Sequence, residues 1–335
     1  MYKRIAVIGA GSWGMAIADL LHANGHSVIL WEYNEQDYRL LKSTRANHSR
    51  LKNFSLPAGI DITNSLDTAV KSADLILLAT PSQFTRRVLE SMAPLVSSDV
   101  QIASLAKGIE NGTLMRMSEV IADVLHCKSN RVATISGPSH AEEVAVKAPT
   151  AVVVATLDDS MAVRVQELFS NSYFRVYKSN DIIGVELGGS LKNIIAIATG
   201  IADGLGLGDN TRGALITRGL AEMTRLGVTL GARAETFAGL SGIGDMVTTC
   251  GSRHSRNRFV GEAIGKGERL DDILAHMTMV AEGVATTRSG HELSIRHGVE
   301  MPITRAVNQV LFENKPPAEA VAELMGRSLK AEVWR

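Results

Sequence analysis

Cysteine, net charge and long apolar runs are all scarce in this sequence of 335 residues. The two cysteines, Cys127 and Cys250, lie far apart and lack C-x-x-C spacing, which argues against a disulfide framework and a metal site and favours a reducing compartment. Lysine plus arginine and aspartate plus glutamate both total 35. No net field therefore draws the chain to nucleic acid or to an anionic membrane surface.

The most apolar stretch, from Asn193 to Gly208, contains Asp203 and several glycines and falls short of the roughly 20 apolar residues that a membrane span needs. The sequence starts directly with an apolar strand, which leaves no room for a signal peptide. We therefore expect a cytoplasmic protein without a membrane partner. A hydrophobic content of 45% is ample for a sizeable core, and the length favours two domains.

The N-terminus combines a strand, a glycine-rich turn and a helix. The apolar run from Ile5 to Ile8 leads into Gly9, Gly11 and Gly14 at G-x-G-x-x-G spacing, and a helical pattern follows from Met15 to Leu21. This order is typical of the entry of a dinucleotide-binding βαβ unit. The first glycine allows the tight turn, the second lets the backbone approach a pyrophosphate, and the third lets helix and strand pack closely. The alternative is a glycine-rich turn in an unrelated α/β protein.

A second strand, from Ser27 to Trp31, is followed by Glu32, about 20 residues past the glycines, where such folds present an acid to the adenosine ribose. A carboxylate there accepts a hydrogen bond from the 2′-OH of NAD and repels the 2′-phosphate of NADP. Glu32 therefore favours NAD without excluding NADP. In the alternative interpretation Glu32 is a solvated charge at a strand end, and Tyr33 or Asn34 lines the same rim.

Strand-like and helix-like segments alternate through the first half of the chain, which predicts a mostly parallel sheet covered by helices on both faces. The predicted strands are Ile5 to Ile8, Val28 to Trp31, Leu75 to Ala79, Gln101 to Ser104, Val132 to Ile135 and Ala151 to Ala155. From about Ser179 long helical patterns take over. We predict a Rossmann-like dinucleotide-binding domain over residues 1–178 and an all-helical substrate-binding domain over residues 179–335, with the active cleft between them.

Lys192 lies in a very apolar helical pattern, with Gly188, Gly189 and Ala196 on its face. Two adjacent glycines inside a helix cost about 1 kcal/mol each relative to alanine, and close approach of a ligand would explain them. A lysine buried beside another cation has a lowered pKa, which suits it to take a proton from an alcohol. The alternative is a lysine whose ammonium reaches solvent, with glycines that serve helix packing.

Other segments also carry candidate side chains. Asp245, after a glycine-rich loop, would orient Lys192 or hold a substrate hydroxyl, and would otherwise cap the next helix. Arg256 belongs to a run with three arginines, Ser252 to Phe259, near a helix start. Such donors suit a phosphate, although a solvated basic face is the commoner reason for such a run. His140 is the one rival general base, with a turn histidine as its alternative.

Together these motifs resemble, over nearly the whole chain, the bacterial-type NAD(P)-dependent glycerol-3-phosphate dehydrogenases. The resemblance is carried by Val7–Gly14, Ala106–Glu110, Ser136–Ser139, Val185–Asn193, Gly242–Asp245, Ser255–Arg258 and Met325–Arg327. Their number, order and spacing make it specific. The departures are small: Met15 and Ser139 stand where the family often has threonine, and Glu32 stands where some relatives carry a small residue.

The resemblance implies a reversible hydride transfer that interconverts dihydroxyacetone phosphate and sn-glycerol 3-phosphate for phospholipid synthesis. It implies NAD or NADP as cofactor, no metal, and a homodimer. It makes Lys192 the proton acceptor, with Asp245 orienting. The implied substrate-binding residues are Lys107, Gly137, Ser139, Lys192, Asn193, Asp245, Ser255, Arg256 and Asn257. The implied cofactor contacts, beside the three glycines and Glu32, are Ser12, Trp13, Tyr33, Lys107, Ala141, Arg256, Val280 and Glu282.

Two other functions stay open on the sequence alone. One is a dehydrogenase with the same two-domain plan that acts on another small hydroxy compound, and the cluster around Arg256 argues against it if that substrate lacks a phosphate. The other is a non-catalytic NAD(H)-sensing protein, which would tolerate the loss of Lys192.

Overall fold

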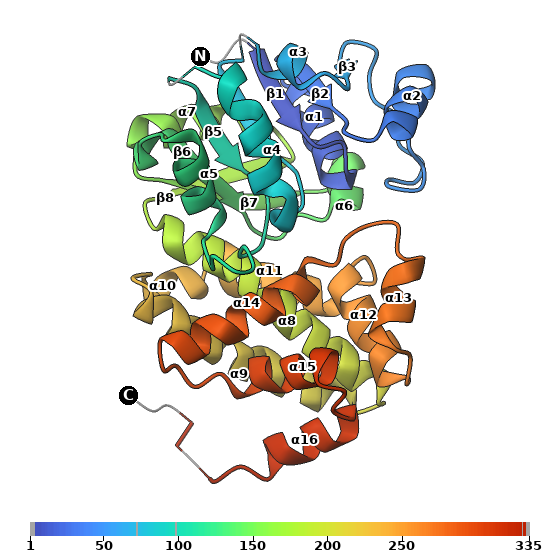
Figure 1. The fold of residues 1–335 in the computed structure, drawn as a ribbon, viewed down its shortest axis with the longest axis vertical. Coiled ribbons are helices and arrows are strands. Elements are labelled where there is room, and N and C mark those ends of the chain that lie inside the picture. Colours follow the sequence, from blue (N-terminus) through green and yellow to red (C-terminus); the bar gives the residue numbers. More distant parts are fainter. Residues whose placement is uncertain (1–3, 72, 98, 330, 333–335) are drawn as a thin grey trace.

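The computed structural model describes residues 4–71, 73–97, 99–329 and 331–332, so the outer ends of the two predicted domains lie outside the described residues. Eight strands form one sheet in the order β3-β2-β1-β4-β5-β6-β7-β8 (Figure 1). They are β1 (Arg4–Ile8), β2 (Ser27–Trp31), β3 (Asp61–Thr63), β4 (Leu75–Leu78), β5 (Gln101–Ser104), β6 (Val132–Ser136), β7 (Thr150–Thr156) and β8 (Phe174–Ser179). All neighbouring strands are parallel except β6 and β7. The predicted fold class is therefore confirmed, with the Rossmann strand order extended by β7 and β8.

The sequence patterns miss two strands, β3 and β8, at the two edges of the sheet. β3 has three residues, too few to show a pattern. β8 alternates the buried Phe174 and Val176 with the exposed Arg175 and Tyr177, as expected for an edge strand with one covered face. It therefore lacks the continuous apolar run that marks the central strands.

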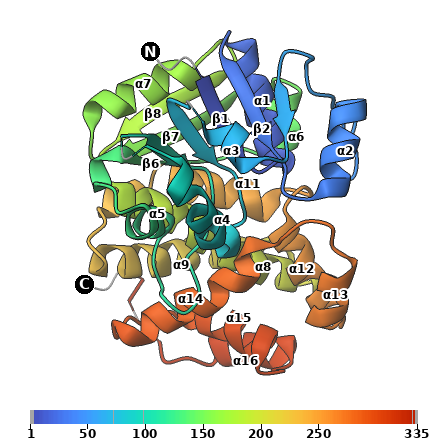
Figure 2. The same ribbon diagram turned by 45° about the horizontal axis from the view of Figure 1, so that its top comes forward.

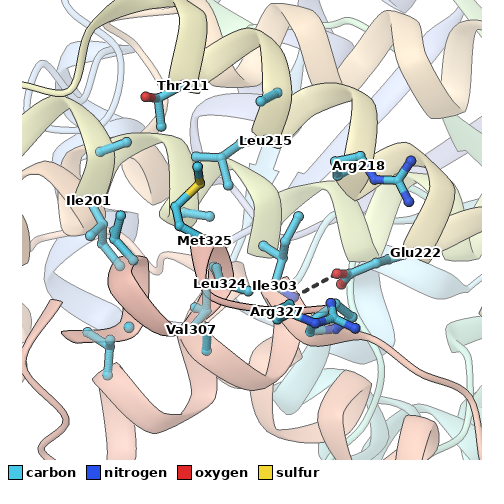
Figure 3. A pocket seen from close by; sticks show the side chains of 18 of the residues that line it. Ile201, Thr211, Leu215, Arg218, Glu222, Ile303, Val307, Leu324, Met325 and Arg327 are labelled. Atoms are coloured by element: carbon cyan, nitrogen blue, oxygen red, sulfur yellow. Dashed lines mark hydrogen bonds between the residues drawn. The ribbon is translucent and has the colours of Figure 1, made fainter. Parts of the chain in front are cut away.

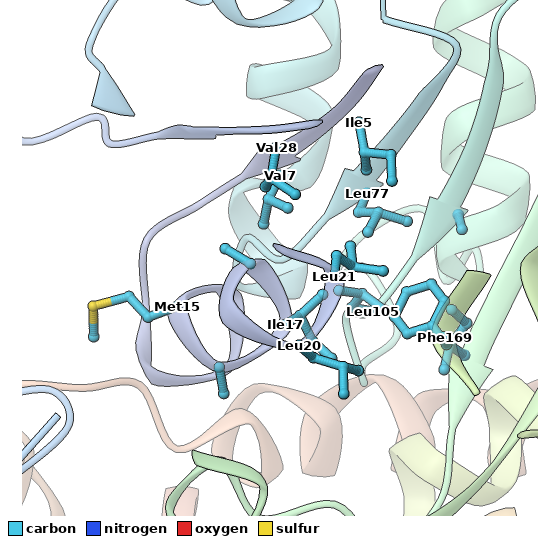
Figure 4. Close-up of a cluster of buried hydrophobic side chains, with 14 of the residues drawn as sticks. Ile5, Val7, Met15, Ile17, Leu20, Leu21, Val28, Leu77, Leu105 and Phe169 are labelled. Atoms are coloured by element: carbon cyan, nitrogen blue, oxygen red, sulfur yellow. The ribbon is translucent and has the colours of Figure 1, made fainter. Parts of the chain in front are cut away.

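Seven helices accompany the strands in the described part of this region. They are α1 (Ser12–Ala23), α2 (Glu35–Thr44), α3 (Leu66–Val70), α4 (Thr85–Met92), α5 (Met117–Leu125), α6 (Ala141–Ala145) and α7 (Asp159–Phe169). Ile5 and Val7 of β1 pack into a cluster with residues of α1, α6 and α7, of which Figure 4 shows Ile17 and Phe169. Ala6 and Ile8 face the opposite way, against α3, α4 and α5. The period-two pattern of β1 thus divides two cores, one on each face of the sheet.

The helical region begins with α8 (Ile182–Gly204), against which most of the later helices pack, while α16 packs on α15. The later helices are α9 (Gly208–Thr229), α10 (Ala234–Phe237), α11 (Asp245–Gly251), α12 (Arg256–Gly265), α13 (Leu270–His276), α14 (Glu282–Arg296), α15 (Pro302–Phe312) and α16 (Pro317–Met325). Figures 1 and 2 both place α15 and α16 on the side away from the sheet. By length and composition α8 could cross a membrane, because it begins at Ile182. The expectation drawn from the stretch Asn193 to Gly208 alone, that the apolar segment is too short for a membrane span, is wrong. However, 94% of the apolar window of α8 is buried inside the protein, as in a core helix.

The two adjacent glycines of α8 serve packing within the chain. A Cβ added at Gly188 would lie 2.7 Å from the carbonyl oxygen of Ser241, and one added at Gly189 would lie 2.3 Å from Ser136 Oγ. They permit the close approach of the segment before α11 and of the end of β6. This packing fixes the position of Lys192, one turn further along α8.

We expect Gly188→Ala to lower the free energy of unfolding by about 1–3 kcal/mol, because its methyl group would overlap a backbone carbonyl that cannot move freely. Gly213→Ala in α9 is the matched control, since a Cβ there would meet no atom within 4 Å. It should raise stability by up to about 1 kcal/mol through helix propensity. Urea unfolding of both variants tests this pair, and equal effects would contradict the packing role of Gly188.

Candidate active site

Two lysines from different parts of the chain meet on one buried carboxylate. Lys192 Nζ donates to Asp245 Oδ1 at 2.9 Å and to Thr249 Oγ1 at 2.5 Å. Lys107, in the loop after β5, donates to Asp245 Oδ2 at 2.6 Å and to the carbonyl oxygen of Gly137 at 2.9 Å. Lys192 and Asp245 are 5% and 2% exposed, so Lys192 does not extend to solvent. We call Lys107, Lys192, Asp245 and Thr249 the lysine cluster.

The lysine cluster changes the acidity of its members. Burial lowers the pKa of Lys192 to about 8, with the Lys107 cation acting in the same direction and Asp245 opposing both. Burial alone would raise the pKa of Asp245, but the two lysines hold it below its usual range. Asp245 therefore stays ionised, and Lys192 can gain or lose a proton close to neutral pH.

The segment before Asp245 is helical, not the loop that the sequence suggests. Leu240–Gly244 forms a π-helical turn, and Asp245 is the first residue of α11. Asp245 and Thr249 are four residues apart, so they lie on one face of α11. The sequence analysis misses Thr249. Its spacing from Asp245 would have revealed it only once this segment was known to be a helix.

The residues expected on the substrate side form a second group, at the start of α12. Asn257 Nδ2 donates to Asn193 Oδ1 at 2.8 Å, and Asn257 Oδ1 accepts from the backbone of Gly283 at 2.9 Å. Ser255 caps α12 by accepting from the backbone N–H of Arg258. Arg256 is exposed and donates to the carbonyl oxygen of Val280 at 2.7 Å.

Of the arginines in this run, Arg258 forms an ion pair with Asp203 at 2.7 Å. Arg256 instead contacts a neutral carbonyl group and lies within electrostatic reach of Glu282 and Glu142. Arg256 is therefore the member best placed to bind an incoming anion. The remaining substrate-side residue, Ser139, donates its hydroxyl to the carbonyl oxygen of Gly137, which also accepts from Lys107.

The glycine-rich turn has the geometry that a dinucleotide needs. Gly9 has a φ of +113°, and a Cβ added at Gly14 would lie 1.9 Å from the carbonyl oxygen of Gly9. A Cβ added at Gly11 would meet no atom within 4 Å, so open space borders the start of α1. These residues fit a pyrophosphate at the N-terminus of this helix.

Glu32 is not a solvated charge, since it is 4% exposed and each of its carboxylate oxygens accepts a hydrogen bond. One carboxylate oxygen accepts from the backbone of Asn34 at 2.8 Å, and the other accepts from Arg50 at 2.5 Å. Arg50 also donates to the carbonyl oxygen of Ala10 at 2.8 Å and pairs with Asp37 at 2.5 Å. Tyr33, beside this group, is 70% exposed. Arg50 lies in an irregular segment, where no sequence pattern marks it.

The helical region also reaches over the cofactor side of the sheet. Ser12 Oγ contacts Met279 Sδ at 3.8 Å, and Glu282 accepts from the backbone and hydroxyl of Ser82 at 2.9 and 2.5 Å. Val280, between them, is 40% exposed. Of the other expected cofactor contacts, Trp13 packs half-buried against the core and Ala141 begins α6. The candidate residues thus gather beyond the carboxyl ends of the parallel strands, where ligands bind in such sheets.

A cavity of about 500 Å³ lies elsewhere, between α8, α9, α15 and α16. Figure 3 shows its mainly apolar lining and the hydrogen bond from the backbone of Ile303 to Glu222, 2.6 Å long. Glu222 caps α15 in this way, and its burial raises its pKa to about 7. None of the site residues expected from the sequence lines this cavity.

Comparison with known proteins identifies similar chains. Residues 4–162 match the model for the N-terminus of NAD-dependent glycerol-3-phosphate dehydrogenase, and residues 181–322 match the model for its C-terminus. An NAD(P)+ glycerol-3-phosphate dehydrogenase from Geobacter sulfurreducens is 52% identical over 335 residues, which is 100% of both chains. One from Geobacter sp. is 52% identical over 99% of both. The crystal structure of glycerol-3-phosphate dehydrogenase from Coxiella burnetii superimposes with a TM-score of 0.93 at 41% identity, over 97% of this chain and 99% of that one.

We expect Thr249→Val to destabilise the protein by about 1–3 kcal/mol, because a buried ammonium hydrogen of Lys192 would lose its acceptor. Thr248→Val is the matched control, since its hydroxyl bonds to the carbonyl oxygen of Gly244 in its own helix turn. Urea unfolding at a pH below the pKa of Lys192 measures both. If Thr249→Val is as stable as Thr248→Val, the role of Thr249 in the lysine cluster is contradicted.

Proposed function

The chain belongs to the family of NAD-dependent glycerol-3-phosphate dehydrogenases, and we propose that Lys192 is the group that exchanges a proton with the substrate in the reaction of this family. The reaction is the reversible oxidation of glycerol 3-phosphate to dihydroxyacetone phosphate with NAD(P). The observation that carries the proposal is the buried contact of Lys192 with Asp245 and Thr249, at a pKa of about 8.

Lys192 in its amine form accepts the proton of the C2 hydroxyl during oxidation, and its ammonium form returns a proton to the C2 oxygen during reduction. Asp245 holds the nitrogen in place and stabilises its charged form. Lys107, on the other oxygen of Asp245, would place a second positive charge next to the reacting oxygen of the substrate. Both lysines thus stabilise the negative charge that develops on that oxygen.

The glycine-rich turn and the start of α1 would hold the pyrophosphate of the cofactor, with Ser12, Trp13, Ala141, Val280 and Glu282 around it. Support comes from the open space at Gly11 and from the contact of Met279 with Ser12. When bound, the nicotinamide accepts or delivers the hydride.

The phosphate of the substrate would be held by Arg256 and the residues around it. Arg256 is exposed, and its guanidinium can form two parallel hydrogen bonds to phosphate oxygens. Asn257 and Asn193 hold the start of α12 against α8 and α14, which keeps Arg256 at a fixed distance from Lys192. We also propose Ser255, Ser139 and Gly137 as substrate contacts.

The chain favours NAD over NADP under this proposal. Arg50 is shared between Glu32 and Asp37, so one guanidinium and two carboxylates leave a net negative charge beside the glycine-rich turn. A ribose 2′-OH can donate to Glu32, whereas a 2′-phosphate would meet the carboxylate charge. Tyr33 offers an exposed ring on the same rim.

We further propose that the enzyme works in the cytoplasm as a homodimer and reduces dihydroxyacetone phosphate for phospholipid synthesis. Two free cysteines are consistent with a reducing compartment. Light scattering on the purified protein would give twice the chain mass of 35.9 kDa for a dimer.

The pH dependence of kcat/KM, which reports the pKa values of the free enzyme, tests the role of Lys192. Because its pKa is lowered to about 8, reduction should slow as pH rises through that value and the ammonium is lost, while oxidation should rise to a plateau. Lys192→Arg keeps the positive charge but cannot release a proton, so it should be inactive in oxidation at every pH. Flat profiles in both directions would contradict proton exchange by Lys192.

Cofactor choice is tested by Glu32→Gln. Removal of this carboxylate leaves Arg50 with one carboxylate partner, Asp37, so we expect the ratio of kcat/KM for NADPH to that for NADH to rise about tenfold or more. Glu35→Gln removes an exposed carboxylate that pairs with Arg39 and is the matched control. The same ratio in wild type and Glu32→Gln would show that Glu32 does not select the cofactor.

A further inference from the structure

Two buried polar atoms beside the lysine cluster have no hydrogen-bond partner in the part of the chain that the structure describes. They are Ser136 Oγ and His140 Nε2, at the two ends of the loop between β6 and α6. Buried polar groups are paired in the great majority of cases, so unpaired ones next to a cluster of charged side chains are candidates to bind a ligand. This loop also contains Gly137, whose carbonyl oxygen accepts hydrogen bonds from both Ser139 and Lys107.

Both residues lie at the junction between the sheet and the helical region. Ser136 Oγ lies against α8, where a Cβ added at Gly189 would be 2.3 Å from it and 3.7 Å from Lys107 Cγ. The ring of His140 lies 6.1 Å from the ring of His254, which precedes Arg256 by two residues. His140 therefore stands between the lysine cluster and the segment that carries Arg256.

We propose that His140 binds the phosphate group of the substrate, with Nε2–H donating to a phosphate oxygen on the side opposite Arg256. This inference rests on the proposed function, because it assumes a phosphorylated three-carbon substrate at the lysine cluster. A phosphate dianion held by Arg256 alone keeps one uncompensated charge. A protonated His140 supplies the second positive charge and the second set of hydrogen bonds.

The charges around His140 couple this contact to a proton. The groups that face it are Lys107 after β5, Lys192 on α8, Asp245 on α11, Glu142 on α6 and the neighbouring His254. Burial and the two lysine cations lower the pKa of His140 in the free protein, and the two carboxylates oppose this. A phosphate dianion next to the ring acts in the opposite direction and favours the imidazolium. Substrate binding therefore draws a proton from solvent onto His140.

The steady-state test compares His140→Gln with wild type and with His291→Gln. His291 is the matched control, because its Nδ1 is also buried without a partner among the described residues, but it lies on α14 and is none of the site residues. We expect His140→Gln to raise KM for dihydroxyacetone phosphate about 10- to 100-fold while kcat changes little, and to flatten the rise of KM with pH. His291→Gln should behave as wild type.

Inorganic phosphate separates the two ends of the substrate. Its inhibition constant as a competitive inhibitor should rise in His140→Gln by a factor similar to the rise in KM for dihydroxyacetone phosphate. If the variant binds dihydroxyacetone phosphate more weakly but is inhibited by inorganic phosphate as strongly as wild type, His140 contacts the hydroxyl or carbonyl end of the substrate, and the phosphate assignment is wrong. An unchanged KM in a folded His140→Gln variant that turns over substrate overturns the inference and leaves the proposed function intact.

Calorimetry on the wild-type protein tests the same inference without a variant. Titration of dihydroxyacetone phosphate into the NAD+ complex, which cannot react, in buffers of different ionisation enthalpy, should report uptake of about one proton at a pH below the pKa of Lys192 where free His140 is neutral. No proton uptake would overturn the inference even if His140→Gln fails to fold. Wild-type protein that binds NADH without turning over the substrate would instead overturn the proposed function.

Discussion

A single buried carboxylate, that of Asp245, forms ion pairs with two lysines, one from the sheet region and one from the helical region. Lys107 comes from the loop after β5 and Lys192 from the core helix of the helical region. Burial of three charges is costly, and removal of one member would leave the others uncompensated. The cluster therefore requires that α8 lies close both to the sheet and to the segment before α11, and Gly189 permits the first approach and Gly188 the second. The same burial brings Lys192 to a pKa of about 8.

The remaining parts of the site are arranged around that cluster. The loops after β1, β4, β5 and β6 lie at the carboxyl ends of their strands and supply the glycine-rich turn, Ser82, Lys107 and Gly137. The helical region contributes Met279, which contacts Ser12, and Glu282, which accepts a hydrogen bond from Ser82. It also contributes Arg256, which lies outside the lysine cluster. A cofactor and a phosphorylated substrate would thus each be held by both regions of the chain, with the reacting atoms next to Lys192.

Local patterns in the sequence are enough for the sheet and for the order of the site motifs. Buried parallel strands leave continuous apolar runs, and the glycine spacing between strand and helix has one common structural meaning. The edge strands β3 and β8 lack such runs, and the helical start of α11 is hidden by its glycines. Thr249 is identified by its spacing from Asp245 only once α11 is known to be a helix. Arg50 lies in an irregular segment, where no spacing identifies it. The role of Gly188 and Gly189 could not be predicted from local sequence patterns, because only the fold shows that they face Ser241 and Ser136.

Turnover by Lys192→Ala tests the proposed chemistry most directly. NADH binding, followed by fluorescence, and the loss of NADH absorbance with dihydroxyacetone phosphate are measured on the same preparation. If Lys192 exchanges the proton, the variant binds NADH as tightly as wild type and turns over about 10²- to 10⁴-fold more slowly. A variant that binds NADH normally and turns over at the wild-type rate would contradict the assignment of Lys192.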